Sequence, residues 1–199
     1  MIAVVDSGGA NISSIVFALQ RIGAKVVFTH DAAIITEAER VILPGVGTAQ
    51  IAMNRLQQLN LIDCICSLKQ PVLGICLGMQ ILFEHSMEGN VDLLGIFPGN
   101  LMRFDEAKST VVPHIGWNTV RFNTDHKLFY NVPQDSHFYF VHSYYALKNE
   151  NTLAKISIDT AEKSIHTAEN QMSKVGVPRA YRRQRKDPRR TCQCVAFPF

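Results

Sequence analysis

Residues 72–80, with the sequence VLGICLGMQ, decide the fold of this chain. An apolar run enters Gly-x-Cys-x-Gly, and the pattern of an amphipathic helix follows at once. This order is that of a nucleophile elbow, a sharp strand-to-helix turn that exposes a reactive side chain. The helix N-terminus favours thiolate over thiol. We therefore predict that Cys76 is a nucleophile and that the N–H of Leu77 serves an oxyanion. A buried structural cysteine is the alternative, which the glycines two residues to either side disfavour.

A second glycine turn follows another apolar run, residues 41–43. Ligands of open α/β sheets bind at the carboxyl ends of the strands. We therefore expect the turn residues Gly45, Val46 and Gly47 to lie beside Cys76 and to complete an oxyanion hole. The dinucleotide motif G-x-G-x-x-G is excluded because Gln50 stands at its last position.

Strand and helix patterns alternate through the first half of the chain. The pattern predicts an α/β fold with an open, mostly parallel sheet and helices on both faces. The expected strands are residues 2–5, 25–29, 40–43 and 71–76. The expected helices are residues 12–22, with Asn11 as N-cap, 48–59, 61–68 and 77–83. After about residue 93, short β-rich runs predict partly antiparallel strands at one edge. Residues 160–175 are polar and show no strand or helix periodicity.

Composition and charge exclude several classes of protein. The chain has 199 residues, of which 47% are hydrophobic and 19% charged, as in a globular domain. Its longest apolar run, residues 71–83, is shorter than the ~20 residues of a membrane span. No signal peptide pattern is present, so we expect a cytoplasmic protein without a membrane partner. The five cysteines are an odd number, which predicts reduced thiols. Their C-x-C spacing does not suit zinc, and we expect no metal and no cofactor.

The charge is unevenly distributed. Residues 174–199 hold eight of the 20 Lys and Arg and one of the 17 Asp and Glu, a local charge of +7. The formal charge of the whole chain is +3, so residues 1–173 carry −4. A basic tail can bind nucleic acid. No aromatic platform or recognition motif accompanies this one, so we expect no nucleic-acid partner.

Further motifs make the chain similar to a known family. They are DSGGANISS at residues 6–14, LPGVG at 43–47, PHIGWN at 113–118 and FVHSYY at 140–145. With the cysteine elbow, they resemble the class I glutamine amidotransferases, whose catalytic triad is Cys-His-Glu. The segment 113–118 narrows the resemblance to the glutamine amidotransferase subunit of imidazole glycerol phosphate synthase, over residues 1 to about 157. This segment and the PGVG turn disfavour another elbow-cysteine hydrolase.

The resemblance implies an activity and a partner. Cys76 would attack the side-chain amide of glutamine, release ammonia and leave a thioester that is hydrolysed to glutamate. The ammonia would pass to a (βα)8-barrel cyclase subunit in a heterodimer. That subunit forms imidazole glycerol phosphate and an aminoimidazole carboxamide ribonucleotide in histidine biosynthesis. The resemblance assigns glutamine binding to Gln80, Ser143 and Tyr144, and the cyclase interface to Pro113, His114, Trp117 and Asn118. In the same resemblance, His142 is a structural neighbour and not the catalytic base.

The C-terminal part departs from this family. Its His and Glu lie in a motif resembling Gly-Val-Gln-Phe-His-Pro-Glu. Gly176 and Val177 match the start of that motif, but Ala180, Tyr181 and Arg182 stand where His, Pro and Glu belong. We therefore divide the chain into an amidotransferase domain, residues 1–157, and an atypical basic segment, residues 158–199. A change of reading frame after about residue 155 would explain the division. The alternative function is a catalytically disabled subunit that keeps only cyclase binding.

Overall fold

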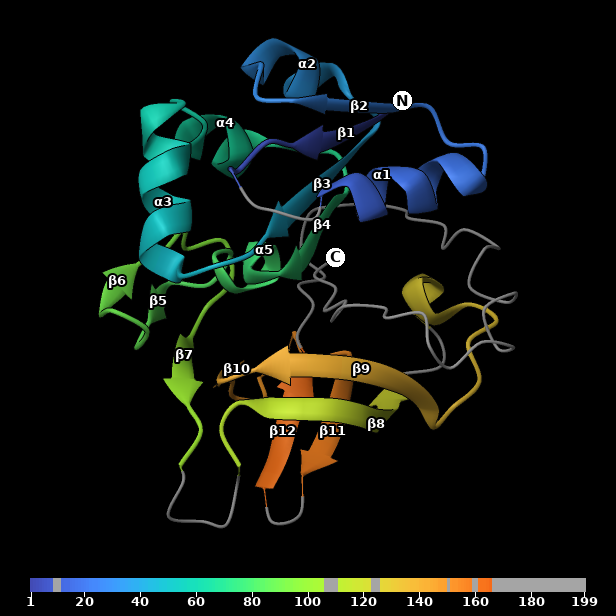
Figure 1. Cartoon of the computed structure of the whole chain (residues 1–199), viewed down its shortest axis with the longest axis vertical. Helices are drawn as coiled ribbons and strands as arrows, with labels where there is room; N and C mark the ends of the chain where they lie inside the picture. Colours follow the sequence, from blue (N-terminus) through green and yellow to red (C-terminus); the bar gives the residue numbers. More distant parts are fainter. Residues whose placement is uncertain (9–11, 106–110, 123–125, 150, 159–160, 166–199) are drawn as a thin grey trace.

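A parallel sheet forms the first half of the molecule (Figure 1). The structure is a computed structural model, and it describes residues 1–8, 12–105, 111–122, 126–149, 151–158 and 161–165. The sheet has the strand order β2-β1-β3-β4, and every pairing is parallel. Its strands are β1 (Ile2–Val5), β2 (Val26–Thr29), β3 (Arg40–Gly45) and β4 (Val72–Cys76). The predicted α/β fold with a mostly parallel sheet is confirmed.

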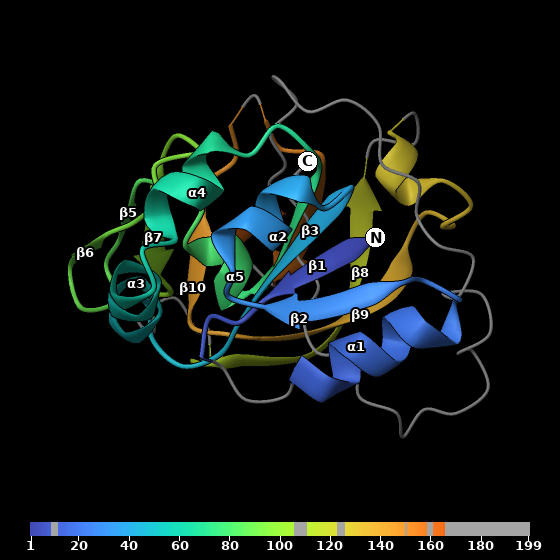
Figure 2. The same ribbon diagram turned by 90° about the horizontal axis from the view of Figure 1, so that it is seen from above.

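Helices cover both faces of this sheet. The chain moves from β1 outward to β2 and then back to β3, so right-handed connections place successive helices on opposite faces. Figure 2 shows α1 on one side of the sheet and α2 and α4 on the other. The helices are α1 (Ile12–Arg21), α2 (Ala32–Glu37), α3 (Ala49–Gln58), α4 (Ile62–Ser67) and α5 (Leu77–Gln80). The predicted N-cap of α1, Asn11, lies outside the described residues.

Two helices differ from the predicted pattern. The sequence pattern predicted no helix at α2. Asp31 stabilises the start of this short helix, because its carboxylate accepts from the N–H groups of Ala33 and Ile34. Helix α5 ends at Gln80 instead of residue 83. The N–H groups of Leu82 and Phe83 bond to carbonyls three residues back, so a tighter turn continues the chain.

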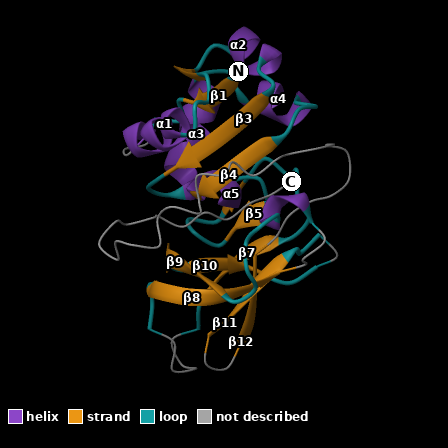
Figure 3. Ribbon diagram, turned by 90° about the vertical axis from the view of Figure 1, so that its right-hand side faces the viewer, coloured by secondary structure: helices purple, strands orange, loops and turns teal. Residues whose placement is uncertain are grey.

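The second half forms a separate, mostly antiparallel sheet (Figure 3). Its order is β6-β5-β7-β10-β12-β11-β8-β9, so these strands do not extend an edge of the parallel sheet as the sequence indicated. The bounds are β5 (His85–Ser86), β6 (Val91–Asp92), β7 (Asn100–Arg103), β8 (His114–Phe122), β9 (Ser136–His142), β10 (Tyr144–Ala146), β11 (Ala154–Ile158) and β12 (Ala161–Ile165). A 3-10 helix, η2 (Lys127–Phe129), precedes β9.

Strand β12 lies in a stretch for which the periodicity predicted no strand. It pairs antiparallel with β11 along its whole length and touches β10 through Ala146 and Ser164. Backbone hydrogen bonds to the neighbouring strands β10 and β11 hold β12 in the sheet. Because these bonds do not depend on the side chains, no hydrophobic pattern in the sequence indicates the strand.

Two apolar cores meet at one side chain. The larger core lies around the parallel sheet, and the smaller one lies beneath β8, β9 and β11. Met79 of α5 packs against both cores, so the elbow helix joins the two halves. Among the described residues, no helix is long and apolar enough to cross a membrane.

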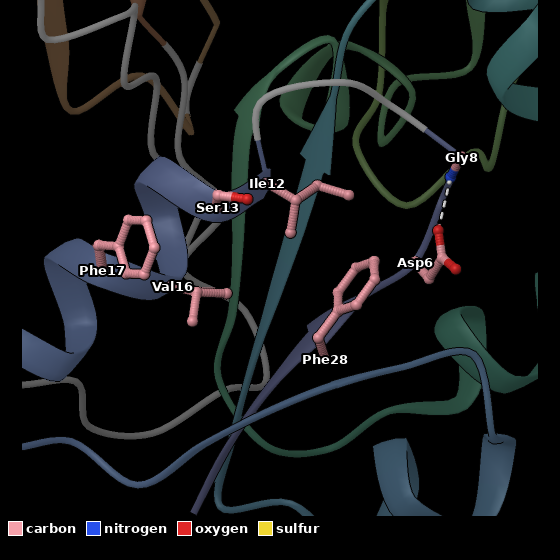
Figure 4. Close-up of a pocket in the computed structure, with 7 residues that line it drawn as sticks. All are labelled: Asp6, Gly8, Ile12, Ser13, Val16, Phe17 and Phe28. Atoms are coloured by element: carbon pink, nitrogen blue, oxygen red, sulfur yellow. Dashed lines mark hydrogen bonds between the residues drawn. The ribbon is translucent and has the colours of Figure 1, made fainter.

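Helix α1 lies over the sheet less tightly than its amphipathic pattern suggests, since none of its described residues is buried. An open hollow of about 570 Å³ separates it from β2 (Figure 4). Phe17 and Phe28 are both exposed at this hollow, with exposed fractions of 58% and 46%. The wall residues are Asp6, Gly8, Ile12, Ser13, Val16, Phe17 and Phe28.

Candidate active site

Cys76 occupies a strained turn between β4 and α5. Its backbone angles are φ 55° and ψ −120°, outside the regions that a non-glycine residue ordinarily adopts. Strain of this kind is found where a nucleophile must project from the end of a sheet. The predicted strand–turn–helix around the cysteine is therefore present.

Three glycines let the backbone pack closely around this turn. A Cβ on Gly78 would lie 1.8 Å from the carbonyl oxygen of Leu43 in β3. On Gly74 it would lie 2.5 Å from the Cα of Met79, and on Gly45 2.5 Å from the backbone nitrogen of Gly78. Each position thus admits only hydrogen at Cα, and strands β3 and β4 and helix α5 interlock through them.

The PGVG turn lies beside the cysteine. In the parallel register of β3 and β4, Gly45 is opposite Cys76. The buried hydroxyl of Ser7 donates to the carbonyl of Pro44 over 2.8 Å, which fixes the end of β3. Val46 is exposed, and Gly47 has φ +93°, a conformation that favours glycine. The structure thus brings the predicted oxyanion residues to the same sheet edge as the nucleophile.

Electrostatics at the cysteine oppose the sequence-based expectation of a stabilised thiolate. Burial raises the pKa of the Cys76 thiol above its ordinary value, the backbone hydrogen bond from Leu77 lowers it, and the negative charge of Glu88 raises it. Helix α5 is a single turn, so its dipole is small. The thiol is therefore protonated at neutral pH and needs a proton acceptor before it attacks.

Glu88 is a site residue that the sequence analysis missed. Its carboxylate accepts from the N–H of Ala49, the first residue of α3, over 2.9 Å. Its own N–H bonds to the hydroxyl of buried Ser86 over 3.1 Å. These contacts hold a negative charge near the Cys76 thiol. The residue lies in a turn after β5, where no motif distinguishes it from a surface glutamate.

The predicted glutamine-binding residues come from three elements. Gln80 is half-buried at the end of α5, one helical turn after Cys76. Ser143 joins β9 to β10, and its carbonyl accepts from the N–H of Phe104 over 3.0 Å. Tyr144 begins β10 and packs against the larger core, the core that also holds Leu77.

The residues predicted to face a partner divide between two sides of β8. Pro113 and Trp117 are exposed, and the Trp117 ring makes an edge contact with Tyr139, with 5.5 Å between centroids. His114 and Asn118 point to the other side of the sheet and are hydrogen-bonded there. Successive strand residues face opposite sides, so one segment cannot place all of them on one surface.

The described residues contain no group of three or more His, Cys, Asp or Glu side chains that could hold a metal ion. Cys64, Cys66 and Cys76 are free thiols. Ala180, at the position of the family histidine, lies outside the described residues.

Comparison with known proteins agrees with this geometry. Residues 3–177 match the family model of class-I glutamine amidotransferase. Two solved structures share the fold. One is a glutamine amidotransferase with a TM-score of 0.59 and 14% identity, covering 82% of this chain and 87% of that one. The other, described as a GMP synthase component from Thermoplasma acidophilum, has a TM-score of 0.55 and 17% identity over 80% of this chain and 78% of that one. The chain is thus a class-I glutamine amidotransferase.

Within this class, curated relatives narrow the family. Subunit HisH of imidazole glycerol phosphate synthase from Mannheimia succiniciproducens is 49% identical over 151 residues, 76% of this chain and 77% of the relative. The HisH protein of Pasteurella multocida is 47% identical over 77% of each chain. The HisH protein of Haemophilus influenzae is 47% identical over 77% and 76%. The chain belongs to the HisH family, which favours the amidotransferase function over a catalytically disabled chain.

Proposed function

We propose that this chain hydrolyses glutamine at Cys76 and supplies the ammonia to a cyclase, as part of imidazole glycerol phosphate synthase. The observation that carries the proposal is the strained Cys76 turn with the PGVG segment in register beside it. A sharp turn that exposes a cysteine next to backbone N–H donors suits acyl transfer from an amide.

The reaction follows from these groups. The Cys76 sulfur attacks the carboxamide carbon, and the N–H groups around Val46, Gly47 and Leu77 receive the oxyanion. The C–N bond then breaks, the leaving nitrogen takes the proton that the Cys76 thiol gave up, and ammonia departs. Water hydrolyses the thioester to glutamate and restores the thiol. Because burial raises the pKa of the Cys76 thiol, the thiol must lose its proton before the sulfur attacks, and the rate should increase with pH.

The substrate side has complementary charges. Glutamine carries an α-ammonium group, and the Glu88 carboxylate lies close enough to Cys76 to influence its pKa. We assign the ammonium group to Glu88, and the remaining polar contacts to Gln80, Ser143 and Tyr144. An ammonium group at Glu88 would also offset the negative charge that opposes thiolate formation.

The partner surface is the exposed face of β8 and β9. Ile115 lies opposite Val141, and Trp117 lies opposite Tyr139. Ile115, Trp117 and Val141 have exposed fractions of 57%, 50% and 41%. We name these four residues the β8–β9 stripe. Three exposed apolar side chains on one face, one of them a tryptophan, suit a protein partner, and we assign the cyclase to this stripe. We expect this chain and the cyclase to form a heterodimer that has the lyase activity of the synthase. The cytoplasmic location stays a prediction.

We also propose the division into an amidotransferase domain, residues 1–157, and an atypical basic segment, residues 158–199. The charge of +7 on residues 174–199 supports it. Strand β12 speaks against a boundary at residue 157, because it lies beyond that residue and still pairs with β11 in the sheet of the first part.

The test is glutamate release from glutamine by the purified chain, alone and with the cyclase and its nucleotide ligand. We expect activity that depends on the cyclase, disappears in Cys76→Ala and persists in Cys66→Ala, which removes an exposed thiol elsewhere. A chain that binds the cyclase but releases no glutamate would refute glutamine hydrolysis by this chain.

A further inference from the structure

Two histidines form a hydrogen-bonded chain beneath the β8–β9 stripe. The Nε2 atom of His114 lies 2.7 Å from the side-chain nitrogen of Asn118. Its Nδ1 atom lies 3.0 Å from Nε2 of His142. Nδ1 of His142 in turn lies 2.9 Å from the carbonyl oxygen of Tyr144. All four residues are partly buried.

If both rings are neutral, the contact with Tyr144 fixes which nitrogen of each histidine carries its proton. A carbonyl oxygen only accepts, so His142 Nδ1 carries hydrogen and donates to Tyr144. The other nitrogen of a neutral His142 ring is then an acceptor, so His114 donates to it from Nδ1. His114 Nε2 is left as the acceptor for the Asn118 amide. With both rings neutral, every contact in the chain joins one donor to one acceptor.

The hydrogen-bonded chain ends at the start of β10, which pairs antiparallel with β7 from Tyr144 onward. Three further contacts hold this segment. The carbonyl of Ser143 accepts from the N–H of Phe104 over 3.0 Å. The carbonyl of Tyr144 accepts from His142. The ring of Tyr145 stacks on Phe104 at 4.9 Å with an interplanar angle of 9°. Of these contacts, only the one at Tyr144 depends on a histidine, His142, whose proton can lie on either ring nitrogen. The contact is a hydrogen bond only when that proton is on Nδ1.

We propose that His142, oriented by His114 and Asn118, is a positioning residue that holds Ser143 and Tyr144 in the conformation that binds glutamine. This inference rests on the proposed function, because that function assigns glutamine to the two residues. His142 acts through the backbone and does not touch the reacting atoms. Loss of its donated bond should weaken glutamine binding more than it changes the stability of the fold.

Two substitutions separate the two ends of the His142 ring. His142→Asn places an amide nitrogen near the position of Nδ1, so it keeps a donor for Tyr144 and loses the acceptor for His114. His142→Gln places an amide oxygen near the position of Nε2, so it keeps the acceptor and loses the donor. His137→Gln is the matched control, because His137 is exposed on the same strand.

The readout is protection of Cys76 from iodoacetamide by glutamine, followed by mass spectrometry of the peptide that contains Cys76. We expect His142→Gln to raise the half-protecting glutamine concentration about five- to tenfold, the effect of one lost hydrogen bond. His142→Asn and His137→Gln should stay within about twofold of the unaltered chain. A purely structural role would make the Asn variant as poor as the Gln variant, and that result would overturn the proposal.

Nitrogen-15 NMR of the histidine rings tests the hydrogen-bonded chain from Asn118 to Tyr144 directly. We expect hydrogen on Nδ1 of both His114 and His142, and a proton on Nε2 of a neutral His142 would overturn the proposal. Glutamine that fails to protect the unaltered chain would refute the proposed function, and the positioning role would fall with it. Protection of the unaltered chain with no change in His142→Gln would refute the positioning role alone.

Discussion

The tight backbone approach at the elbow makes Gly78→Ala the most demanding substitution. The new Cβ would lie 1.8 Å from the carbonyl oxygen of Leu43, and real Cβ contacts are not found below 3.0 Å. The β3 backbone and α5 must therefore separate by about 1.2 Å at this point. Neither atom belongs to a flexible side chain, so the strain falls on the β3–β4 ladder. We expect the free energy of unfolding to fall by about 4 kcal/mol or more.

Helix propensity alone predicts the opposite sign, because alanine stabilises a helix relative to glycine by about 1 kcal/mol. The assay is urea unfolding of the full chain, with Gly95→Ala as the control. Gly95 has φ +64° and nothing within 4 Å of an added Cβ, so that variant should lose only about 1–2 kcal/mol of conformational strain. A Gly78→Ala chain as stable as the unaltered one would refute the interlocking of β3 and α5.

Three further changes probe the site and its surface. In Glu88→Gln the loss of a negative charge should lower the pKa of Cys76, so the rise of the alkylation rate with pH should shift to lower pH values. The control Glu84→Gln also removes a carboxylate that accepts a backbone N–H, and it should leave this pH profile unchanged. Ser7→Ala should cost about 1–2 kcal/mol in urea unfolding, because it leaves a buried carbonyl at the end of β3 without its donor. In Trp117→Ala the affinity for the cyclase in a titration should fall at least tenfold, while the unfolding midpoint changes little because the ring is half exposed; an unchanged affinity would place the partner elsewhere.

Local sequence determined the parallel sheet and the elbow. Apolar strands alternate with helices in residues 2–83, and this pattern predicts a parallel sheet whose faces are covered by helices. The glycines two residues to either side of Cys76 indicated a close backbone approach. Parallel strands end at a common edge, so the PGVG turn was also expected beside Cys76. These features follow from patterns within short stretches of the sequence: hydrophobic periodicity and the spacing of glycines.

Tertiary structure alone decided the rest. The antiparallel strands form a separate sheet, because pairing across β7, β10 and β12 depends on contacts between segments far apart in the sequence. Alternation along β8 places His114 and Trp117 on opposite sides of the sheet. Only the tertiary structure shows that the side with Trp117 is exposed and that His114 on the other side is hydrogen-bonded. Glu88 lies near Cys76 only after β5 and α3 come together. Burial then raises a thiol pKa that the helix N-terminus was expected to lower, because desolvation and charge depend on everything packed around a group and not on its neighbours in the chain.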